Sequence, residues 1–204
     1  MNGRPVWKIS IISIMAFLSA ALAGCQHLRW SPEAIQGVWV SPCLPARAEI
    51  GFSQASVDET QIFTATEVQI RQRNYTDAAC RDPYFSRTVL ATFSVGDAIL
   101  DPIGARKLEL AEAKVLVRVE AAKAASDLSQ QFYCGRDDWA LGVDKDVAGL
   151  TCNGVKTPAA GAVVHQIAQV DEDTLYLGSA SSGDGSTPDK RPTVLSKTPY
   201  QRVR

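Results

Sequence analysis

Hydrophobic and polar residues alternate along several stretches of the chain with a period of two, which is typical of β-strands that bury one face. In residues 67–75, for example, Val68 and Ile70 alternate with the polar Gln69 and Arg71. The pattern predicts strands at residues 35–40, 67–75, 85–95, 108–119, 163–170, 174–177 and 192–202. The acidic residues 171–173 suit a hairpin connection. The sequence therefore predicts a mainly β, antiparallel fold.

One stretch departs from this period. Ala121, Ala125, Leu128 and Phe132 lie on one stripe of a helix, so we expect a short helix that covers the strands. Two further stretches, residues 149–161 and 181–192, are punctuated by Gly and Pro and are predicted to be loops.

The N-terminus is patterned differently. Arg4 and Lys8 precede an apolar run over residues 9–23, which is the order of a bacterial signal peptide. The run is shorter than the roughly 20 apolar residues of a membrane-spanning helix. Leu22-Ala23-Gly24-Cys25 resembles the lipobox of bacterial lipoproteins, which implies cleavage after residue 24 and lipidation of Cys25. An uncleaved anchor and a plain secretory signal are the alternatives.

The resemblance to bacterial lipoproteins also implies a location. An Asp after the lipidated cysteine commonly holds such proteins at the inner membrane, so Gln26 implies sorting to the outer membrane, on its periplasmic leaflet or at the cell surface. We expect residues 1–24 to be the signal peptide, 25–34 a tether broken by Ser31-Pro32, and 35–204 one folded domain.

The leader carries two basic and no acidic residues, so its removal changes the net charge from −1 to −3. This charge disfavours nucleic acid as a partner, and membrane attachment would rest on the acyl chains.

Four cysteines besides Cys25 would lie in an oxidising compartment, where an even count indicates two disulfides. Of the three pairings, we expect Cys43 with Cys80 and Cys134 with Cys152, because each then closes one segment of successive strands. Zinc is the competing interpretation. However, there is no C-x-x-C, and His27 and His165 lack ligand spacing to the cysteines, so we expect no metal.

Gly37-Val38-Trp39, at the start of the first predicted strand, resembles the G-x-W signature of lipocalins and lipocalin-like barrels. The resemblance implies a small closed antiparallel barrel in which Trp39 packs across one end and meets an arginine of the last strand, Arg202 or otherwise Arg191. The chain lacks the T-D-Y motif of the family. Its predicted helix also lies in mid-chain rather than before the last strand.

Candidate catalytic residues are few. His165 is the single histidine of the expected domain, and no G-x-S-x-G, H-E-x-x-H or phosphate-binding glycine loop is present. We therefore expect a non-catalytic binding module without a cofactor, which takes an apolar or amphipathic ligand or an envelope partner. The alternatives are an inhibitor that presents residues 149–161 or 181–192 to a periplasmic or secreted hydrolase or protease, and a purely structural envelope protein.

Overall fold

The computed structural model describes residues 30–46 and 52–204, so the signal peptide and Cys25 lie outside the described residues. Ten strands form the main sheet of the described residues, and eight of them make up the barrel: β1 (Gly37–Val40), β3 (Ser56–Phe63), β4 (Glu67–Tyr75), β5 (Pro83–Ala98), β6 (Arg106–Val119), β10 (Val163–Asp171), β11 (Thr174–Leu177) and β12 (Tyr200–Arg202). Four shorter strands are β2 (Leu44–Pro45), β7 (Asp144–Asp146), β8 (Thr151–Cys152) and β9 (Val155–Lys156). The helices are α1 (Ala122–Gln130) and the 3₁₀ turns η2 (Pro32–Ile35), η3 (Tyr133–Gly135) and η4 (Pro188–Lys190).

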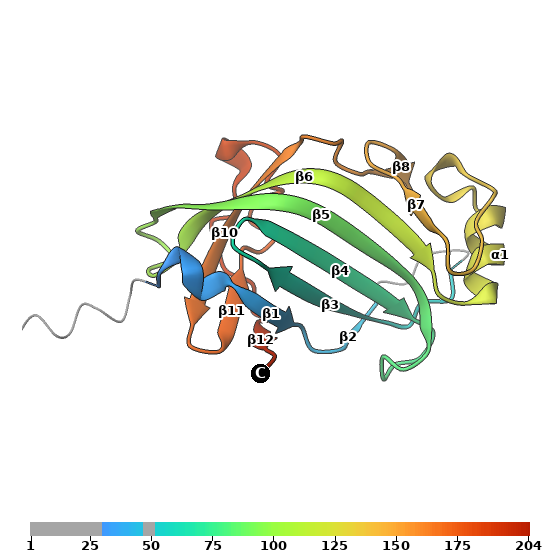
Figure 1. Cartoon of the computed structure of the whole chain (residues 1–204), viewed down its shortest axis with the longest axis horizontal. Helices are drawn as coiled ribbons and strands as arrows, with labels where there is room; N and C mark the ends of the chain where they lie inside the picture. Colours follow the sequence, from blue (N-terminus) through green and yellow to red (C-terminus); the bar gives the residue numbers. More distant parts are fainter. Residues whose placement is uncertain (1–29, 47–51) are drawn as a thin grey trace, which may run out of the picture.

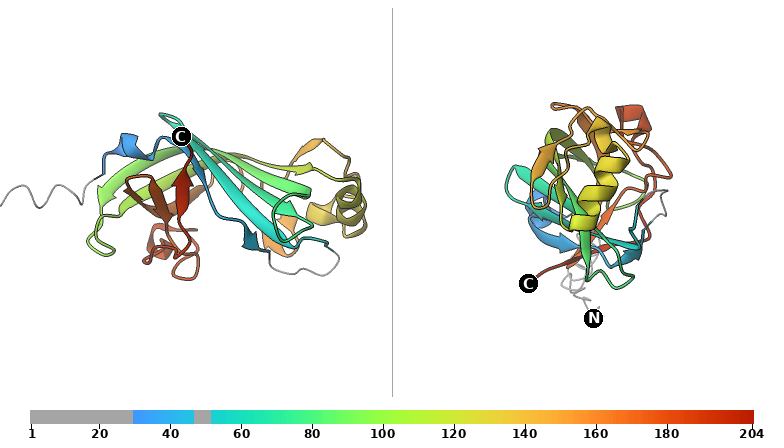
Figure 2. Two further views of the ribbon diagram at one scale, coloured as in Figure 1. Left: turned by 90° about the horizontal axis from the view of Figure 1, so that it is seen from below. Right: turned by 90° about the vertical axis from the view of Figure 1, so that its right-hand side faces the viewer.

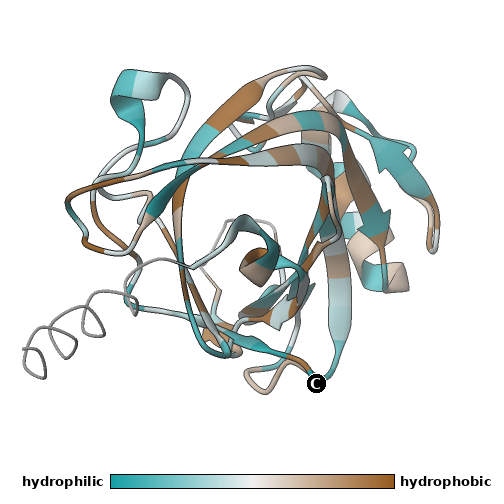
Figure 3. Ribbon diagram, turned by 60° about the vertical axis from the view of Figure 1, so that its left-hand side comes forward, coloured by the Kyte–Doolittle hydropathy of each residue, from teal (hydrophilic) through white to brown (hydrophobic). Residues whose placement is uncertain are grey.

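The eight main strands close into a barrel (Figure 1). Each pairs antiparallel with the next one along the chain, and β1 pairs with both β12 and β3, which joins the two ends of the sheet. Figure 3 looks along this barrel, with the N-terminal turn η2 crossing its end. The prediction of a mainly β, closed antiparallel barrel with one α-helix is confirmed for the described part of the chain.

The alternation of side chains follows the barrel wall, with one change of phase. Val68 and Ile70 pair with Ala91 and Val89 on the inner face of β4 and β5. On β6, the even-numbered Leu108 and Leu110 and the odd-numbered Val115, Val117 and Val119 are all buried. The ladder accommodates both sets because Leu90 pairs with Lys114 and Ala91 with Glu112, which leaves Ala113 as an extra residue in a β-bulge.

Arg202 closes one end of the barrel. Its guanidinium lies over the Trp39 ring, with Cζ 4.0 Å from the ring centroid, and donates hydrogen bonds to the carbonyls of Ala34 (2.7 Å) and Gln36 (2.6 Å). Gly37 has φ of +126°, and a Cβ there would lie 2.7 Å from Nη1 of Arg202. The G-x-W glycine therefore makes room for the arginine. The structure places Arg202, rather than Arg191, against Trp39.

Helix α1 covers the opposite end (Figure 2, right view). The Tyr84 hydroxyl donates to Asp127 of α1, and the Ser53 backbone N–H donates to the same hydroxyl over 3.4 Å. The helix ends at Gln130 and buries Ala124 and Leu128. The expectation that the stripe continues to Phe132 is wrong: this residue adopts a left-handed conformation and is 63% exposed.

Two further boundaries differ from the sequence-based expectation. The last strand is Tyr200–Arg202 rather than residues 192–202, because residues 192–199 cross the surface with one isolated bridge, between Leu195 and Gly178. The expected tether reaches into the folded domain: Trp30 is 9% exposed, and its Nε1 donates to the Gly104 carbonyl over 3.0 Å. Packed structure therefore begins before residue 35. Among the described residues, no helix has the length and apolar character to cross a membrane.

Candidate ligand-binding cavity

The interior of the barrel contains a cavity of about 350 Å³, here called the inner cavity. It lies between β3, β5, β6, β10 and the segment that leads to β12. Its apolar wall is formed by Phe63, Ile70, Val89, Leu108 and Leu110, and its polar wall by Glu59, Gln61, Arg87, Glu112, Gln166 and Tyr200. The inner cavity is therefore amphipathic, because polar and apolar side chains both contribute to its lining.

Glu59, Gln61 and Tyr200 form a connected chain of hydrogen bonds. The Gln61 Nε2 and the Tyr200 hydroxyl both donate to Oε1 of Glu59, each over 2.7 Å. Burial raises the pKa of Tyr200 far above its ordinary value, and the neighbouring Glu59 carboxylate adds to this effect, so the phenol stays a donor. This orientation directs the Gln61 amide nitrogen to Glu59 and leaves its carbonyl oxygen free to face elsewhere.

Two acceptor atoms of the inner cavity are buried and unpaired. Within the described residues, neither Oε1 of Gln61 nor Oε2 of Glu112 has a hydrogen-bond partner, and the two residues are 1% and 7% exposed. Burial raises the pKa of Glu112, and the positive charge of Arg87 partly opposes this. A buried polar atom without a partner costs free energy, so a donor that reached either oxygen would remove this cost.

Arg87 separates the inner cavity from a second one. The helix-side cavity, also of about 350 Å³, lies below the β8–β9 hairpin and is lined by Gln72, Asn74, Phe85, Arg87, Tyr133 and Lys156, among others. In the described part of the chain, Arg87 has no ion pair within 4.0 Å: the ion pairs found there involve other residues. The guanidinium thus places a positive charge between the two cavities, and this charge acts on the Glu112 carboxyl.

The barrel wall is weakly paired at the short strand β12, next to the inner cavity. β12 pairs with β11 through two residue pairs and with β1 through two more. Ser196 and Tyr200 line the inner cavity and also an adjoining cavity of about 270 Å³, which includes Ser41 and Thr198. The segment 196–200 therefore offers a lateral approach to Glu59.

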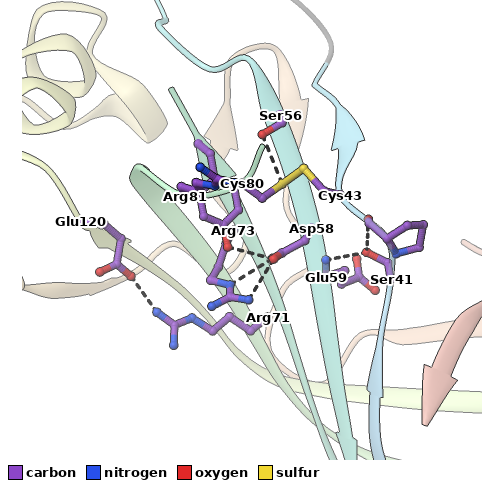
Figure 4. A network of polar contacts seen from close by, with 12 residues as sticks. Ser41, Cys43, Ser56, Asp58, Glu59, Arg71, Arg73, Cys80, Arg81 and Glu120 are labelled. Carbon is purple, nitrogen blue, oxygen red and sulfur yellow. Dashed lines mark hydrogen bonds and ion pairs between the residues drawn. A yellow bond between two sulfur atoms is a disulfide. The ribbon is translucent and has the colours of Figure 1, made fainter. Parts of the chain in front are cut away.

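The outer face of β3 and β4 carries charges that are paired with each other (Figure 4). Arg73 donates to both carboxylate oxygens of Asp58 over 3.0 and 2.9 Å, and Arg71 pairs with Glu120 over 2.7 Å. Burial, together with the hydrogen bond to Asp58, raises the pKa of Tyr75 to about 12. These groups satisfy one another, so we assign them to the barrel wall rather than to a site.

His165 is partnered, which the sequence did not indicate. Its Nδ1 lies 2.5 Å from Oε2 of Glu109, and the same carboxylate accepts a hydrogen bond from Arg191. The His165 backbone N–H donates to the carbonyl of Gly185 over 2.8 Å. Arg191 also donates to the Gln166 carbonyl over 2.6 Å. This cluster fastens the predicted loop 181–192 to the outer face of β10.

The structure brings together some of the residues singled out from sequence. Gly37, Trp39 and Arg202 meet at one end, and the disulfides join Cys43 to Cys80 and Cys134 to Cys152, the pairing between sequence neighbours. Cys25 lies outside the described residues. In the described part, no three His, Cys, Asp or Glu residues are grouped so as to hold a metal ion.

Sequence reasoning missed the polar wall of the inner cavity. Its one signal was that polar residues occupy inward positions of alternating strands, as Gln61 and Glu59 do two and four residues before Phe63. No family model matches this chain, and no curated protein matches it.

Proposed function

We propose that the protein is a membrane-anchored envelope lipoprotein whose lipocalin-like barrel binds an amphipathic small molecule in the inner cavity without transforming it. The observation that carries this proposal is the amphipathic lining of a cavity of about 350 Å³, in which two buried acceptors have no partner in the part of the chain that the structure describes. Small-molecule sites typically have volumes of about 300–1,000 Å³ and combine an apolar lining with a few polar groups.

The test compares two variants of β5. Val89 lines the inner cavity, whereas its neighbour Thr88 points to the opposite face of the same strand. We expect the neutral fluorophore N-phenyl-1-naphthylamine to bind the purified mature protein with saturable, one-to-one enhancement. Val89→Trp should abolish this signal and Thr88→Trp should retain it, with both variants checked by circular dichroism. Equal binding by a folded Val89→Trp protein would place the site elsewhere and overturn the proposal.

Native mass spectrometry of the extracted protein is a second readout. A copurified small molecule that is absent from Val89→Trp would support the proposal and identify the ligand. A native protein that carries no ligand and does not bind the fluorophore would exclude a carrier role.

The proposed anchor is tested separately. Cys25→Ser, or growth with globomycin, should block processing of the precursor and shift the protein from the outer-membrane fraction. Unchanged processing and fractionation would refute lipidation and leave the cavity proposal intact.

A membrane anchor at Cys25 also sets an orientation. Four residues lie between Cys25 and Trp30, so five Cα-to-Cα steps separate the two and span at most about 18 Å. Trp30 is hydrogen-bonded to the β5–β6 loop, in which Leu100 is 93% and Ile103 65% exposed. We propose that this end of the barrel faces the membrane and that α1 and the β8–β9 hairpin face away from it.

Inhibition of an envelope or secreted hydrolase is the second candidate. The observation that favours it is the β8–β9 hairpin, which the Cys134–Cys152 disulfide holds at its base and which presents Val155 at 70% exposure. The pure protein should then inhibit a lysozyme or a protease, and Val155→Asp should relieve the inhibition. No inhibition across a panel of both enzyme classes would remove this candidate.

A further inference from the structure

We propose that the ligand of the inner cavity carries a protonated primary amine on an apolar body, and that Gln61, Glu112 and Glu59 bind this amine. The inference rests on the proposed function and adds the chemical class of the ligand. The main observation for this inference concerns two residues that line the inner cavity. Among the described residues, Oε1 of Gln61 and Oε2 of Glu112 are buried without a hydrogen-bond partner, and both atoms are acceptors.

An ammonium group matches this arrangement because it has three N–H donors and no acceptor. Oε1 of Glu59 already receives two hydrogen bonds, which holds this carboxylate beside the Gln61 amide. Oε2 of Glu112 and Oε1 of Gln61, which also belong to residues that line the inner cavity, accept no hydrogen bond from the described residues. A primary amine supplies the donors that the described side chains do not.

The charges favour a cation over an anion. The inner cavity contains two carboxyl groups, Glu59 and Glu112, and one guanidinium, Arg87. Arg87 lines the inner and the helix-side cavity, so the two carboxyl groups outnumber it in the inner cavity. A carboxylate ligand near Glu112 would meet a like charge in a buried place, whereas an ammonium would neutralise it.

Arg87 and the bound amine both act on the ionisation of Glu112. Burial raises the pKa of this carboxyl, and a positive charge close by lowers it again. The titratable groups facing the cavity are Glu59, Arg87, Glu112 and Tyr200, and Tyr200 remains neutral. We therefore expect the affinity for an amine to increase with pH as Glu112 becomes ionised, as long as the amine itself stays protonated.

The apolar body of the ligand would contact the apolar residues of the inner cavity, which lie beside the polar ones on the same strands, as Phe63 does beside Gln61 on β3. Phe63 and Leu108 there are 3% and 1% exposed, and Phe63 makes an edge contact with Phe93 at 5.1 Å between ring centroids. A flat or short aliphatic group can contact this surface while the amine reaches Glu112. Polyamines without an apolar body would leave this wall in contact with water and are expected to bind more weakly.

The experiment uses three matched probes: 2-phenylethylamine, 2-phenylethanol and 3-phenylpropanoate. We measure their displacement of N-phenyl-1-naphthylamine from the mature protein at pH 8 by fluorescence, and their direct binding by calorimetry. The amine should bind about tenfold more tightly than the alcohol, or better, because the alcohol offers fewer donors and no charge, and the carboxylate should not bind.

Two carboxyl variants localise the effect. Glu112→Gln keeps the shape of the side chain and removes its charge, so it should weaken amine binding about tenfold or more and leave the affinity for the alcohol nearly unchanged. Glu67→Gln makes the same chemical change at an exposed position of β4 and should leave all three affinities unchanged.

Either of two results would overturn the amine inference: equal affinity for the amine and the alcohol, which would mean that water or any hydroxyl satisfies the two oxygens, or unaltered amine binding by Glu112→Gln. If none of the three probes displaces a fluorophore that Val89→Trp excludes, the amine inference fails while the proposed binding function stands. If the fluorophore does not bind either, both fail.

Discussion

Glu112 owes its position inside the barrel to a single extra residue in β6. With Ala113 bulged out of the ladder, Glu112 stays in phase with Leu108 and Leu110, and the strand then resumes with Val115, Val117 and Val119 facing inward. β-Bulges commonly re-aim a side chain next to a functional site. The cost is a buried carboxyl whose Oε2 has no hydrogen-bond partner among the described residues.

Glu112 should make the protein less stable as the pH rises. Its pKa is higher in the folded than in the unfolded chain, because burial disfavours the carboxylate. As the pH increases above its ordinary value of 4.5, the unfolded chain releases the proton first, so the free energy of unfolding falls until the folded form has ionised too. Glu112→Gln should therefore melt at a higher temperature than the native protein at pH 7, by about 2–4 °C for each kcal/mol gained.

Thermal melting followed by circular dichroism from pH 3.5 to 8 checks this expectation. The difference between Glu112→Gln and the native protein should shrink toward zero at the acid end of the range. The exposed Glu67→Gln should follow the native curve throughout. A Glu112→Gln protein that melts no higher than the native one at pH 7 would show that the buried carboxyl carries no penalty.

Segments from the two ends of the described chain meet at the Trp39 end of the barrel: η2 and β1 from one end, and β12 from the other. Arg202 of β12 bonds two carbonyls at η2, covers the Trp39 ring of β1, and its backbone N–H donates to the carbonyl of Asp173 over 2.9 Å. The planar fork of arginine fits two acceptors and a ring face together, which the single ammonium of lysine does not. One side chain thus fastens both ends of the described chain to the same closure.

Arg202→Lys should lower the free energy of unfolding by about 1–3 kcal/mol, because one of the two carbonyl contacts and the stacking on Trp39 are lost. Urea denaturation measures this change. Arg204→Lys is the control: Arg204 contacts Asp173 from an 84% exposed side chain, and the substitution should change stability by less than about 0.5 kcal/mol. Equal effects of the two substitutions would argue against a special role of Arg202 at the closure.

The whole molecule has two chemically different ends. The Trp30 end exposes Leu100 and Ile103 on the β5–β6 loop beside the point where the chain leads back to Cys25, and the far end carries α1 and two disulfide-linked segments, η3 and β8. If Cys25 is lipidated, the short chain between it and Trp30 keeps the first end close to the bilayer.

A tryptophan placed at Leu100 should therefore lie within reach of the lipid. In proteoliposomes of the mature protein made with dibrominated phosphatidylcholine, Leu100→Trp should add fluorescence that the bromines quench. Val155→Trp, at the exposed tip of the opposite end, should add fluorescence that they do not quench. Equal quenching at the two positions would refute the orientation, and a protein that fails to stay in the vesicles would refute the anchor.

Much of the barrel could be predicted from local patterns. The alternation in β4 and the hairpin of β10 and β11 are visible along the sequence, because each depends on neighbours within a few residues. The boundaries of α1 and β12 were predicted less well. Phe132 continues the helical stripe in sequence but turns out of it in the structure, and residues 192–199 have strand-like composition without partners to pair with along their length.

The sequence by itself predicted the strand rhythm outside β3, the pairing of neighbouring cysteines, and Gly37 and Trp39 at one closed end, and it left open whether Arg202 or Arg191 meets Trp39. Only the tertiary structure decided that Glu59, Glu112 and Tyr200 share one cavity, since they lie on β3, β6 and β12. Closing the sheet through the β1–β3 and β1–β12 pairings sets which inward positions face each other across the barrel. Which inward residues meet depends on the registers of all eight barrel strands and on the bulge at Ala113. No local stretch of sequence contains that information.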